Sequence, residues 1–332
     1  MVEEIRWGIV GLGSIAHTFA KDLALVTGGT LTAVASRSLE KAKTFADEYG
    51  AAHTFDSYEA LFESKEVDVV YIATPHTSHE ALSISAMENG KHVLCEKPMG
   101  VNPDQVARMI AVAEKNKVFL MEALWSRFNP SIRKAKQLVE SGEIGSVAFV
   151  HADFAFYALN RDPDNRLLNP DLAGGSLLDI GIYPIFLSYL LLGMPKNIQA
   201  SSHLYKTGVE MQTSMIFDYE GAQAILYSGL NSKSEMKAEI SGTEGSIFLS
   251  PRWHEAQGYS IEKEGELVDY DLPTKGKGYT YEIEEVHSCL ASGMVQSSMW
   301  SHRNSVDLAR LLYEVRQKSN IIFPFEQQKE GV

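Results

Sequence analysis

Two short segments of this chain hold residue types suited to moving a proton. In Cys95-Glu96-Lys97-Pro98, the proline fixes the chain direction just after a charged pair. In the second segment, Asp179 and Tyr183 are four residues apart within an apolar stretch, so a helix would place them on one face. A tyrosine phenol has an ordinary pKa of about 10, so it stays protonated at neutral pH and is a poor base there. A neighbouring ammonium lowers that pKa. The pair Lys97 and Tyr183 therefore indicates acid–base chemistry, with Asp179 as an orienting group.

A structural role is the alternative for each segment. Glu96 and Lys97 would then form an exposed ion pair, and Asp179 would hydrogen-bond a core tyrosine. We favour chemistry because Glu96-Lys97 follows a predicted strand, at the sheet edge where ligands of open α/β folds bind. In addition, a carboxylate and a phenol on an otherwise apolar helix are costly unless they are paired or used.

A glycine-rich run that follows a predicted strand and opens a predicted helix predicts a dinucleotide-binding site. The run is Gly11-Leu12-Gly13-Ser14-Ile15-Ala16. The first glycine allows a tight turn, the second allows the backbone to approach a pyrophosphate, and the alanine allows close helix–strand packing. The helix N-terminus offers N–H groups and a positive dipole end to the phosphates. A glycine-rich turn without a ligand is the alternative. The residues expected to bind the dinucleotide here are Gly11, Gly13, Ser14, Ile15 and Ala16.

The end of the second strand favours NADP over NAD. An NAD site usually places a carboxylate here, but this chain has Ser36 and Arg37, and no acid before Glu40. A hydroxyl and a guanidinium suit a 2′-phosphate. The alternative is a solvated surface arginine, and NAD remains possible.

Three more cofactor-binding residues are expected after another strand. Thr74 and Pro75 end that strand and would line the cofactor trough. His79 opens the next helix, where capping or packing is the favoured role and a direct contact with the cofactor is the alternative.

The elements around these residues indicate an α/β first half. Short apolar runs alternate with amphipathic stretches, which predicts right-handed βαβ units and a parallel sheet covered on both faces. The expected strands are 5–10, 31–35, 67–73, 92–95 and 118–121, and the expected helices are 14–26, 39–48, 58–63, 79–89 and 103–115. Pro103 suits a first helical turn that Asn102 caps.

The second half reads as strands joined by tight turns, which predicts a large open, mostly antiparallel sheet with helices on one face. The expected strands are 146–157, 197–205, 212–219, 222–229, 238–241, 246–249 and 267–271, and the expected helices are 176–192, 281–290 and 305–318. We expect a Rossmann domain over 1–124 and a substrate-binding α+β domain over 125–332, with C-terminal residues packing back on the first.

Composition argues against several classes of protein. The 332 residues include 30 Lys+Arg and 43 Asp+Glu, a net charge of −13, which disfavours nucleic-acid binding. Two cysteines make no disulfide framework, and the N-terminal residues do not resemble a signal peptide. The apolar run 176–192 is shorter than the ~20 residues of a membrane span and reads as a buried helix. We expect a cytoplasmic protein without a membrane partner.

No metal site is expected, because the ten histidines are scattered and neither cysteine has a partner at ligand spacing. There is also no Gly-x-Ser-x-Gly elbow and no Walker lysine.

From residue 5 to about 325, these motifs in their order resemble the Gfo/Idh/MocA oxidoreductase family. Glu122–Phe128 and Asp179–Pro184 are similar to its branch of dimeric dihydrodiol dehydrogenases and NADP-dependent sugar dehydrogenases. The resemblance implies that Lys97 orients cofactor and substrate. It also implies that Tyr183 is the acid/base, where many members of the family have histidine.

The same resemblance suggests further site residues. Arg127 would reach the nicotinamide end or the substrate, and Trp125, which lies in a matching motif, would be an aromatic wall of a substrate pocket. Phe154, Trp253 and Tyr279 are weaker candidates for such walls, because aromatic residues are more often part of the core.

The resulting hypothesis is an NADP-dependent oxidoreductase that moves a hydride between the nicotinamide and a secondary alcohol or ketone of a sugar, cyclic polyol or trans-dihydrodiol. The alternative is a non-catalytic NADP-binding sensor or regulator, since fold alone does not establish turnover. The open sheet face predicts a homodimer.

Overall fold

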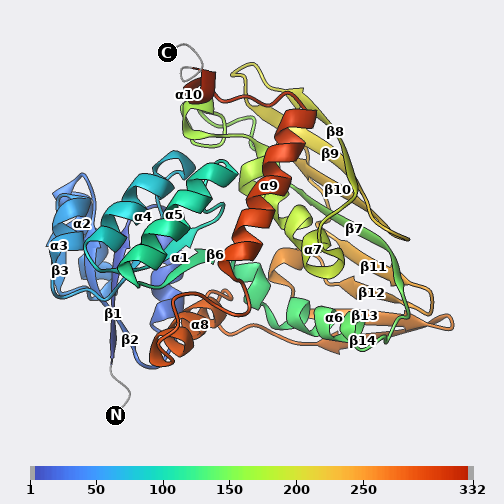
Figure 1. Ribbon diagram of the computed structural model, residues 1–332, viewed down its shortest axis with the longest axis horizontal. Helices are drawn as coiled ribbons and strands as arrows, with labels where there is room; N and C mark the ends of the chain where they lie inside the picture. The colour runs from blue at the N-terminus through green and yellow to red at the C-terminus, as the bar shows by residue number, and fades with distance from the viewer. Residues whose placement is uncertain (1–3, 328–332) are drawn as a thin grey trace. The chain divides into compact units, whose positions relative to one another are not determined.

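The computed structural model describes residues 4–327, which form two compact units (Figure 1). The first unit contains the chain up to Trp125 together with Lys275–Val306. The second contains Ser126–Thr274 and the chain from Asp307 onward. The first unit is thus built from two separate stretches of sequence.

The first unit is a six-stranded sheet in the order β3-β2-β1-β4-β5-β6, and every neighbouring pair is parallel. Its strands are β1 (Ile5–Val10), β2 (Gly29–Ala35), β3 (His53–Phe55), β4 (Val69–Ile72), β5 (His92–Glu96) and β6 (Leu120–Ala123). This is the doubly wound order of a Rossmann domain, so the predicted fold class is confirmed. β3 escaped prediction because three residues with a histidine and a threonine carry no strand periodicity.

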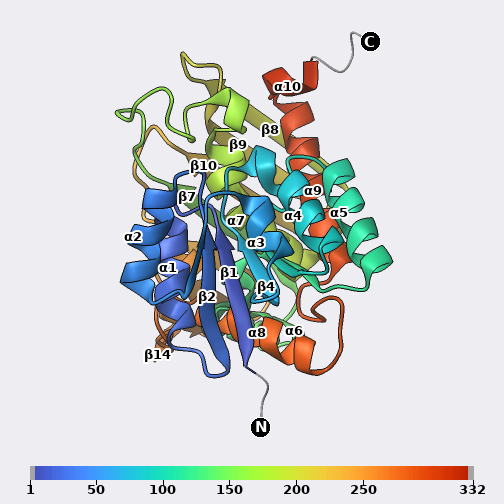
Figure 2. The ribbon, with the colours of Figure 1, turned by 90° about the vertical axis from the view of Figure 1, so that its left-hand side faces the viewer.

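Helices cover both faces of this sheet. They are α1 (Ser14–Leu23), α2 (Leu39–Tyr49), α3 (Tyr58–Glu63), α4 (His79–Glu88), α5 (Pro103–Asn116) and α8 (Thr280–Ala291). Figure 2 shows α1 and α2 on one side of the strands and α3 and α4 on the other. The expected cap of α5 is confirmed, because the Asn102 side chain accepts a hydrogen bond from the Gln105 N–H and Pro103 lies in the first turn.

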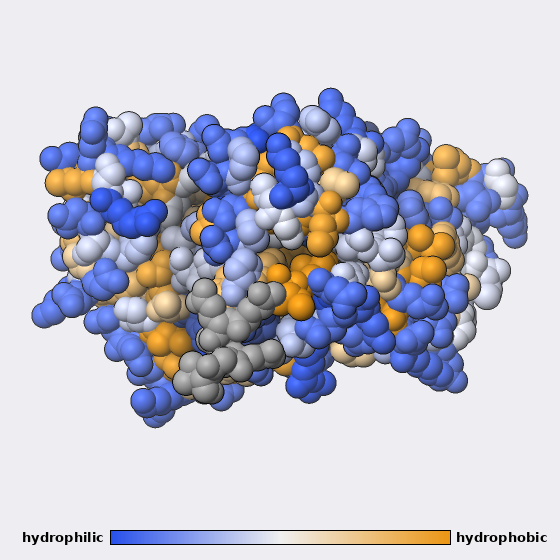
Figure 3. Space-filling view, turned by 90° about the horizontal axis from the view of Figure 1, so that it is seen from above, coloured by the Kyte–Doolittle hydropathy of each residue, from blue (hydrophilic) through white to orange (hydrophobic). Residues whose placement is uncertain are grey.

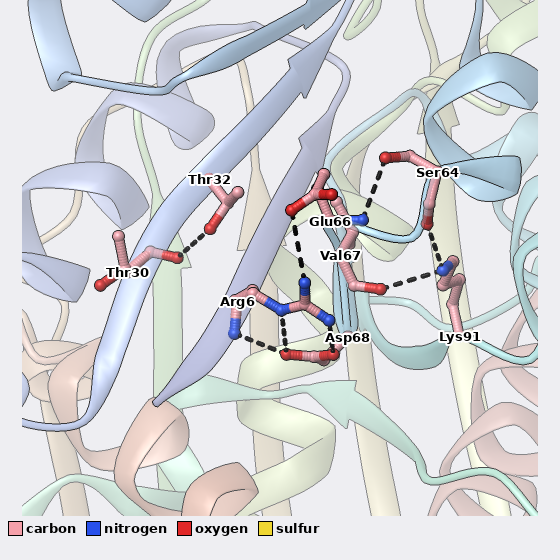
Figure 4. Close-up of polar contacts among 8 residues, drawn as sticks. All are labelled: Arg6, Thr30, Thr32, Ser64, Glu66, Val67, Asp68 and Lys91. Atoms are coloured by element: carbon pink, nitrogen blue, oxygen red, sulfur yellow. Dashed lines mark hydrogen bonds and ion pairs between the residues drawn. The ribbon is translucent and has the colours of Figure 1, made fainter. Parts of the chain in front are cut away.

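A brace at the amino ends of β1 and β4 fixes their register (Figure 4). Arg6 of β1 contacts both carboxylate oxygens of Asp68, with Nη2 2.7 Å from Oδ1 and Nε 3.1 Å from Oδ2. Partial burial raises the pKa of Asp68, but the hydrogen bonds and charge of Arg6 outweigh it, so the pKa is lowered. Beside this pair, Lys91 donates to the carbonyls of Ser64 and Val67. The opposite edge, where the strands end, carries the candidate site.

The second unit contains an eight-stranded sheet in the order β14-β13-β12-β11-β7-β10-β9-β8. Its strands are β7 (Val147–Ala155), β8 (Asn197–Leu204), β9 (Glu210–Asp218), β10 (Gln223–Gly229), β11 (Ala238–Gly242), β12 (Ser246–Leu249), β13 (Gly258–Lys263) and β14 (Glu266–Asp271). The pairs are antiparallel except β7 with β10, which is parallel. The predicted mostly antiparallel sheet is confirmed. The sequence analysis did not anticipate β13.

One face of this sheet is covered by α6 (Pro130–Glu140), which packs on β12 and β13, and by α7 (Ile182–Leu192), which packs on β7 and β10 (Figure 1). The unit also includes most of α9 (His302–Lys318) and the short α10 (Pro324–Gln327). The other face leaves apolar side chains exposed, among them Ile216 and Ile225.

The apolar run considered above as a membrane span is a core element. Pro170–Leu192 is long and apolar enough to cross a bilayer by length and composition alone, but 78% of its most apolar window is buried inside the protein. The face drawn in Figure 3 is mostly hydrophilic, with hydrophobic residues in small groups between charged ones.

Candidate active site

The glycine turn after β1 has the shape that a dinucleotide phosphate requires. Gly11 has φ +86°, and a Cβ added there would lie 2.6 Å from the carbonyl carbon and oxygen of Ala73. A Cβ added at Gly13 would meet nothing within 4 Å. Gly13 is also the N-cap of α1, and no side chain caps that helix. No side chain therefore competes with an anion for the amide groups at its N-terminus.

His79 ties together the chain at the ends of β4 and β5. Its Nε2 lies 2.9 Å from the Thr74 carbonyl oxygen, and its Nδ1 lies 2.8 Å from the Pro98 carbonyl oxygen. The imidazole is fully buried. The buried hydroxyl of Thr74 has no hydrogen-bond partner among residues 4–327, so it is a polar group left over for a ligand.

The end of β2 places Ser36 and Arg37 differently. Ser36 is buried and its hydroxyl accepts a hydrogen bond from the Ser38 N–H at 3.3 Å, whereas Arg37 is exposed. The Ser38 side chain in turn caps α2 by accepting from the Lys41 N–H. The exposed Arg37 guanidinium is therefore the group that can contact a 2′-phosphate.

The Glu96 carboxyl is buried at the end of β5, next to the backbone of Lys97. Glu96 is 6% exposed and accepts hydrogen bonds from the Tyr71 hydroxyl and, at 3.1 Å, from the Lys97 N–H. The Lys97–Pro98 peptide bond is cis. Another buried carboxyl, Glu122, accepts from the Met99 N–H at 2.9 Å. The segment that carries the Lys97 ammonium is therefore held at its backbone by two carboxyls, and the Glu122 contact was missed by sequence reasoning.

A further buried carboxyl lies near Glu96. Glu282 of α8 is fully buried, and neither of its oxygens has a hydrogen-bond partner among the residues that the structure describes. Burial raises the pKa of Glu282 well above its ordinary range, and the negative charges of Glu96 and Asp22 add to this effect. The folded protein therefore binds a proton at Glu282 more tightly than the unfolded chain does.

The Glu282→Gln variant should show this linkage. Because the raised pKa makes the folded state bind the proton more tightly, its stabilising effect is present at acidic pH and is lost as pH rises above about 5. The wild-type free energy of unfolding should fall by about 1–3 kcal/mol relative to the variant between pH 5 and pH 8. Urea denaturation at the two pH values measures this difference. Glu284→Gln, an exposed change on the same helix, is the control; equal slopes for wild type and Glu282→Gln would contradict the assignment.

In the second unit, Asp179 and Tyr183 lie on one continuous helical segment, but its first turn is not the expected α-helix. Leu177–Gly181 forms a π-helical turn, which runs directly into α7. Such turns are rare and are frequent at functional sites. Asp179 is buried and its Oδ1 lies 2.7 Å from Nη1 of Arg166, whose side chain is half exposed. Arg166 was missed because it is one cation in a polar loop without periodicity.

Tyr183 lies in an aromatic cluster with Phe154 and His254. Its ring centroid is 5.5 Å from that of Phe154 and 5.4 Å from that of His254, and the Phe154 and His254 rings stack at 4.1 Å. All three side chains are buried. Phe154, a candidate pocket wall, thus lies beside Tyr183 within this unit, while His254 was not singled out from the sequence.

The remaining aromatic candidates are in other surroundings. Trp125 stacks on Tyr279 within the first unit, with ring centroids 4.8 Å apart and 10° between the planes. Trp253 is fully buried in the second unit and donates its indole N–H to the Asp153 carbonyl. Arg127 is buried in the short helix Trp125–Phe128. In the described residues, no group of three or more His, Cys, Asp or Glu side chains is arranged to hold a metal ion.

A Rossmann unit with an uncapped glycine turn, joined to a unit with a helix that carries a carboxylate and a phenol, defines a dinucleotide-dependent oxidoreductase. Comparison with known families agrees. Residues 5–124 match the model of the oxidoreductase family with an NAD-binding Rossmann fold, and residues 132–248 match the GFO/IDH/MocA C-terminal domain. The chain belongs to the GFO/IDH/MocA oxidoreductase family.

Curated relatives cover almost the whole chain. A trans-1,2-dihydrobenzene-1,2-diol dehydrogenase from Xenopus tropicalis is 34% identical, over 96% of this chain and 99% of its own. The scyllo-inositol 2-dehydrogenase (NADP(+)) IolU of Bacillus subtilis is 33% identical, over 97% and 99%. Among solved structures, KijD10, a 3-ketoreductase from Actinomadura kijaniata in complex with NADP and TDP-benzene, is 28% identical with a TM-score of 0.87, over 96% of this chain and 98% of that one. The resemblance stated from the motifs is confirmed.

Proposed function

We propose that this protein is an NADP-dependent dehydrogenase that interconverts a secondary alcohol and a ketone on a sugar, a cyclic polyol or a trans-dihydrodiol. The observation that carries the proposal is the Tyr183 phenol, one turn from Asp179 and beside Phe154 and His254, in a chain that also keeps Lys97 after β5. The relatives described above are named as a trans-dihydrodiol dehydrogenase, a scyllo-inositol dehydrogenase and a 3-ketoreductase, which supports a secondary alcohol or ketone as the substrate group.

When bound, NADP would supply the hydride-transfer chemistry, and the residues of this chain would bind, orient and move the proton. Tyr183 removes the proton of the substrate hydroxyl during oxidation and returns it during reduction. Lys97 supplies positive charge that stabilises the phenolate and orients cofactor and substrate. Asp179, held by Arg166, anchors the substrate beside the phenol, and Trp125 and Phe154 provide apolar walls.

The cofactor would bind along the edge where the strands of the first unit end. The turn residues Gly11, Gly13, Ser14, Ile15 and Ala16 would take the pyrophosphate. Arg37, with the buried Ser36 beside it, would meet the 2′-phosphate. Thr74, Pro75, Glu96 and Arg127 would line the rest, and His79 would support this lining through the Thr74 and Pro98 carbonyls.

The test is the absorbance of reduced nicotinamide in the presence of aldoses, inositols, trans-dihydrodiols and dicarbonyl compounds, with NADP and NAD compared. Turnover of at least one cyclic polyol, sugar or diol is expected. A protein that binds NADP tightly and turns over none of these substrates would instead fit a sensor, a function for which the relatives give no support.

Arg37→Ala should separate the two cofactors. Loss of a charge-assisted contact with a phosphate costs about 10–100-fold in affinity, so the dissociation constant for NADP should rise by that factor while the constant for NAD is unchanged. Fluorescence titration of both cofactors measures this ratio, with Lys43→Ala, an exposed cation on the neighbouring helix, as control. An unchanged preference for NADP would contradict the role of Arg37.

We also propose that the protein is a homodimer in the cytoplasm. The exposed apolar side chains on the outer face of the eight-stranded sheet, including Ile216 and Ile225, favour a second copy as their cover. Sedimentation at micromolar concentration should show a dimer; a monomer alone would exclude this assembly.

A further inference from the structure

The helical segment with Asp179 and Tyr183 starts against a buried carboxyl that the proposed chemistry does not use. Glu210 is the first residue of β9 and is 1% exposed. Its Oε1 accepts a hydrogen bond from the Leu177 N–H, and the backbone and hydroxyl of Ser176 also hydrogen-bond this carboxyl. A strand residue thus meets the exact start of the π-helical turn.

The Glu210 carboxyl acts as the N-terminal cap of this helical segment. Ser176 stands in the N-cap position but makes no capping hydrogen bond with its own side chain. Its hydroxyl lies 2.9 Å from the hydroxyl of Ser228 in β10 instead. The first N–H groups of a helix have no intrahelical acceptor, and a negative charge there is favoured by the helix dipole. Glu210 supplies the acceptor from a different element, and it also supplies the charge when it is ionised.

The glycine pair before the helix makes room for this contact. Gly175 has φ +117°, and a Cβ added there would lie 1.7 Å from Oε2 of Glu210. A Cβ added at Gly174 would lie 2.6 Å from the Arg166 carbonyl oxygen. The Gly174-Gly175 sequence therefore lets the carboxyl reach the helix start, and the same loop carries the arginine that pairs with Asp179.

We propose that Glu210 is a positioning residue for the reaction: by binding the amides that open the Leu177–Gly181 turn, its carboxylate fixes the helical register that places Asp179 and Tyr183. The inference rests on the proposed function for the role of Tyr183. It makes Glu210 part of the machinery without contact to substrate or cofactor.

The protonation of Glu210 adds a pH dependence to this contact. Burial raises the pKa of Glu210 to about 8, against the lowering effects of the hydrogen bonds from Leu177 and Ser176 and the charge of Arg316. Arg316 of α9 is itself paired with Glu326 of α10. The other neighbouring groups are the amides of Ser176 and Leu177 at the start of the π-helical turn, the Ser176 hydroxyl, and the Ser228 hydroxyl of β10. The ionised carboxylate accepts from more donors than the protonated acid does, so the cap should tighten as pH rises through about 8.

Glu210→Gln tests the proposal, with Glu220→Gln as a matched control, because Glu220 lies on the turn between β9 and β10 and its side chain is 88% exposed. In Glu210→Gln, kcat should fall about 10–100-fold while the dissociation constant of NADP is unchanged. Amides of 174–183 should exchange hydrogen faster than in the control. The limb of the kcat–pH profile that rises near pH 8 should disappear. Glu210→Asp, which keeps the charge at shorter reach, should recover part of the rate.

Amide exchange in the wild-type protein provides a readout that depends on neither a variant nor activity. After correction for intrinsic rates, protection of residues 176–181 should increase between pH 7 and pH 9. Constant protection across this range, or a Glu210→Gln protein with the kcat and exchange of Glu220→Gln, would overturn the proposal. If Tyr183→Phe retained full activity, the proposed function would fail. The exchange data would still test whether Glu210 caps the helical turn.

Discussion

Lys97→Ala should fold, bind NADP and lose about 10³-fold in kcat. The ammonium follows β5 directly, on a backbone held by Glu96 and by the Glu122–Met99 contact, so the side chain can be removed without disturbing its support. In the proposed mechanism, its loss takes away the positive charge that would stabilise the Tyr183 phenolate. Steady-state kinetics with the best substrate of the panel, and fluorescence titration of NADP, measure the two effects separately.

Lys115→Ala is the matched control, because this lysine is exposed in α5 of the same unit. A Lys97→Ala protein with a wild-type kcat would remove Lys97 from the mechanism. A loss confined to the NADP dissociation constant would make it a binding residue only.

Tyr183→Phe should reduce kcat about 10²–10⁴-fold in both directions. The substitution keeps the ring that packs against Phe154 and His254 and removes only the hydroxyl that carries the proton. The increase of the oxidation rate with pH that a titrating base produces should disappear as well. Stopped-flow and steady-state rates across a pH series measure both changes.

Tyr189→Phe provides the control on the same helix, since its hydroxyl donates to Asp307 at 3.1 Å and has no part in the proposed chemistry. The double variant Lys97→Ala/Tyr183→Phe should lose little more than the worse single variant, because the two groups act as one unit. Fully additive losses would show that Lys97 and Tyr183 act independently.

Much of the fold was accessible from the sequence because its strongest signals are local. The buried strands of the first unit read as continuous apolar runs, and Asn102-Pro103 marks the start of α5. The glycine turn was identified because its position after β1 gives each glycine a physical purpose. Elements without a distinctive periodicity were not predicted. β3 has only three residues, and the π-helical turn differs from an α-helix in its hydrogen bonding, which the sequence pattern does not reveal.

The parts of the site that sequence reasoning missed are contacts between distant segments. Arg166 meets Asp179, and Glu210 meets Leu177, through pairings that depend on how loop and strand pack. A buried acid such as Glu282 looks like any surface glutamate until α8 is placed. Residue types therefore suggested the proton chemistry, while the supporting contacts required coordinates.

Residues 275–306 complete the first unit. This affects how the chain folds during synthesis and which fragments of it can fold. Asp22 of α1 accepts hydrogen bonds from the amides of Lys277, Gly278 and Tyr279, and the Trp7 indole donates to His287 of α8 at 3.0 Å. On a ribosome, the nucleotide-binding half must wait until the entire sheet of the other half has been synthesised. A gene fragment that stops at residue 125 would leave Trp7 and Asp22 without these partners, so a shortened Rossmann module should retain residues 275–306 through a fused linker.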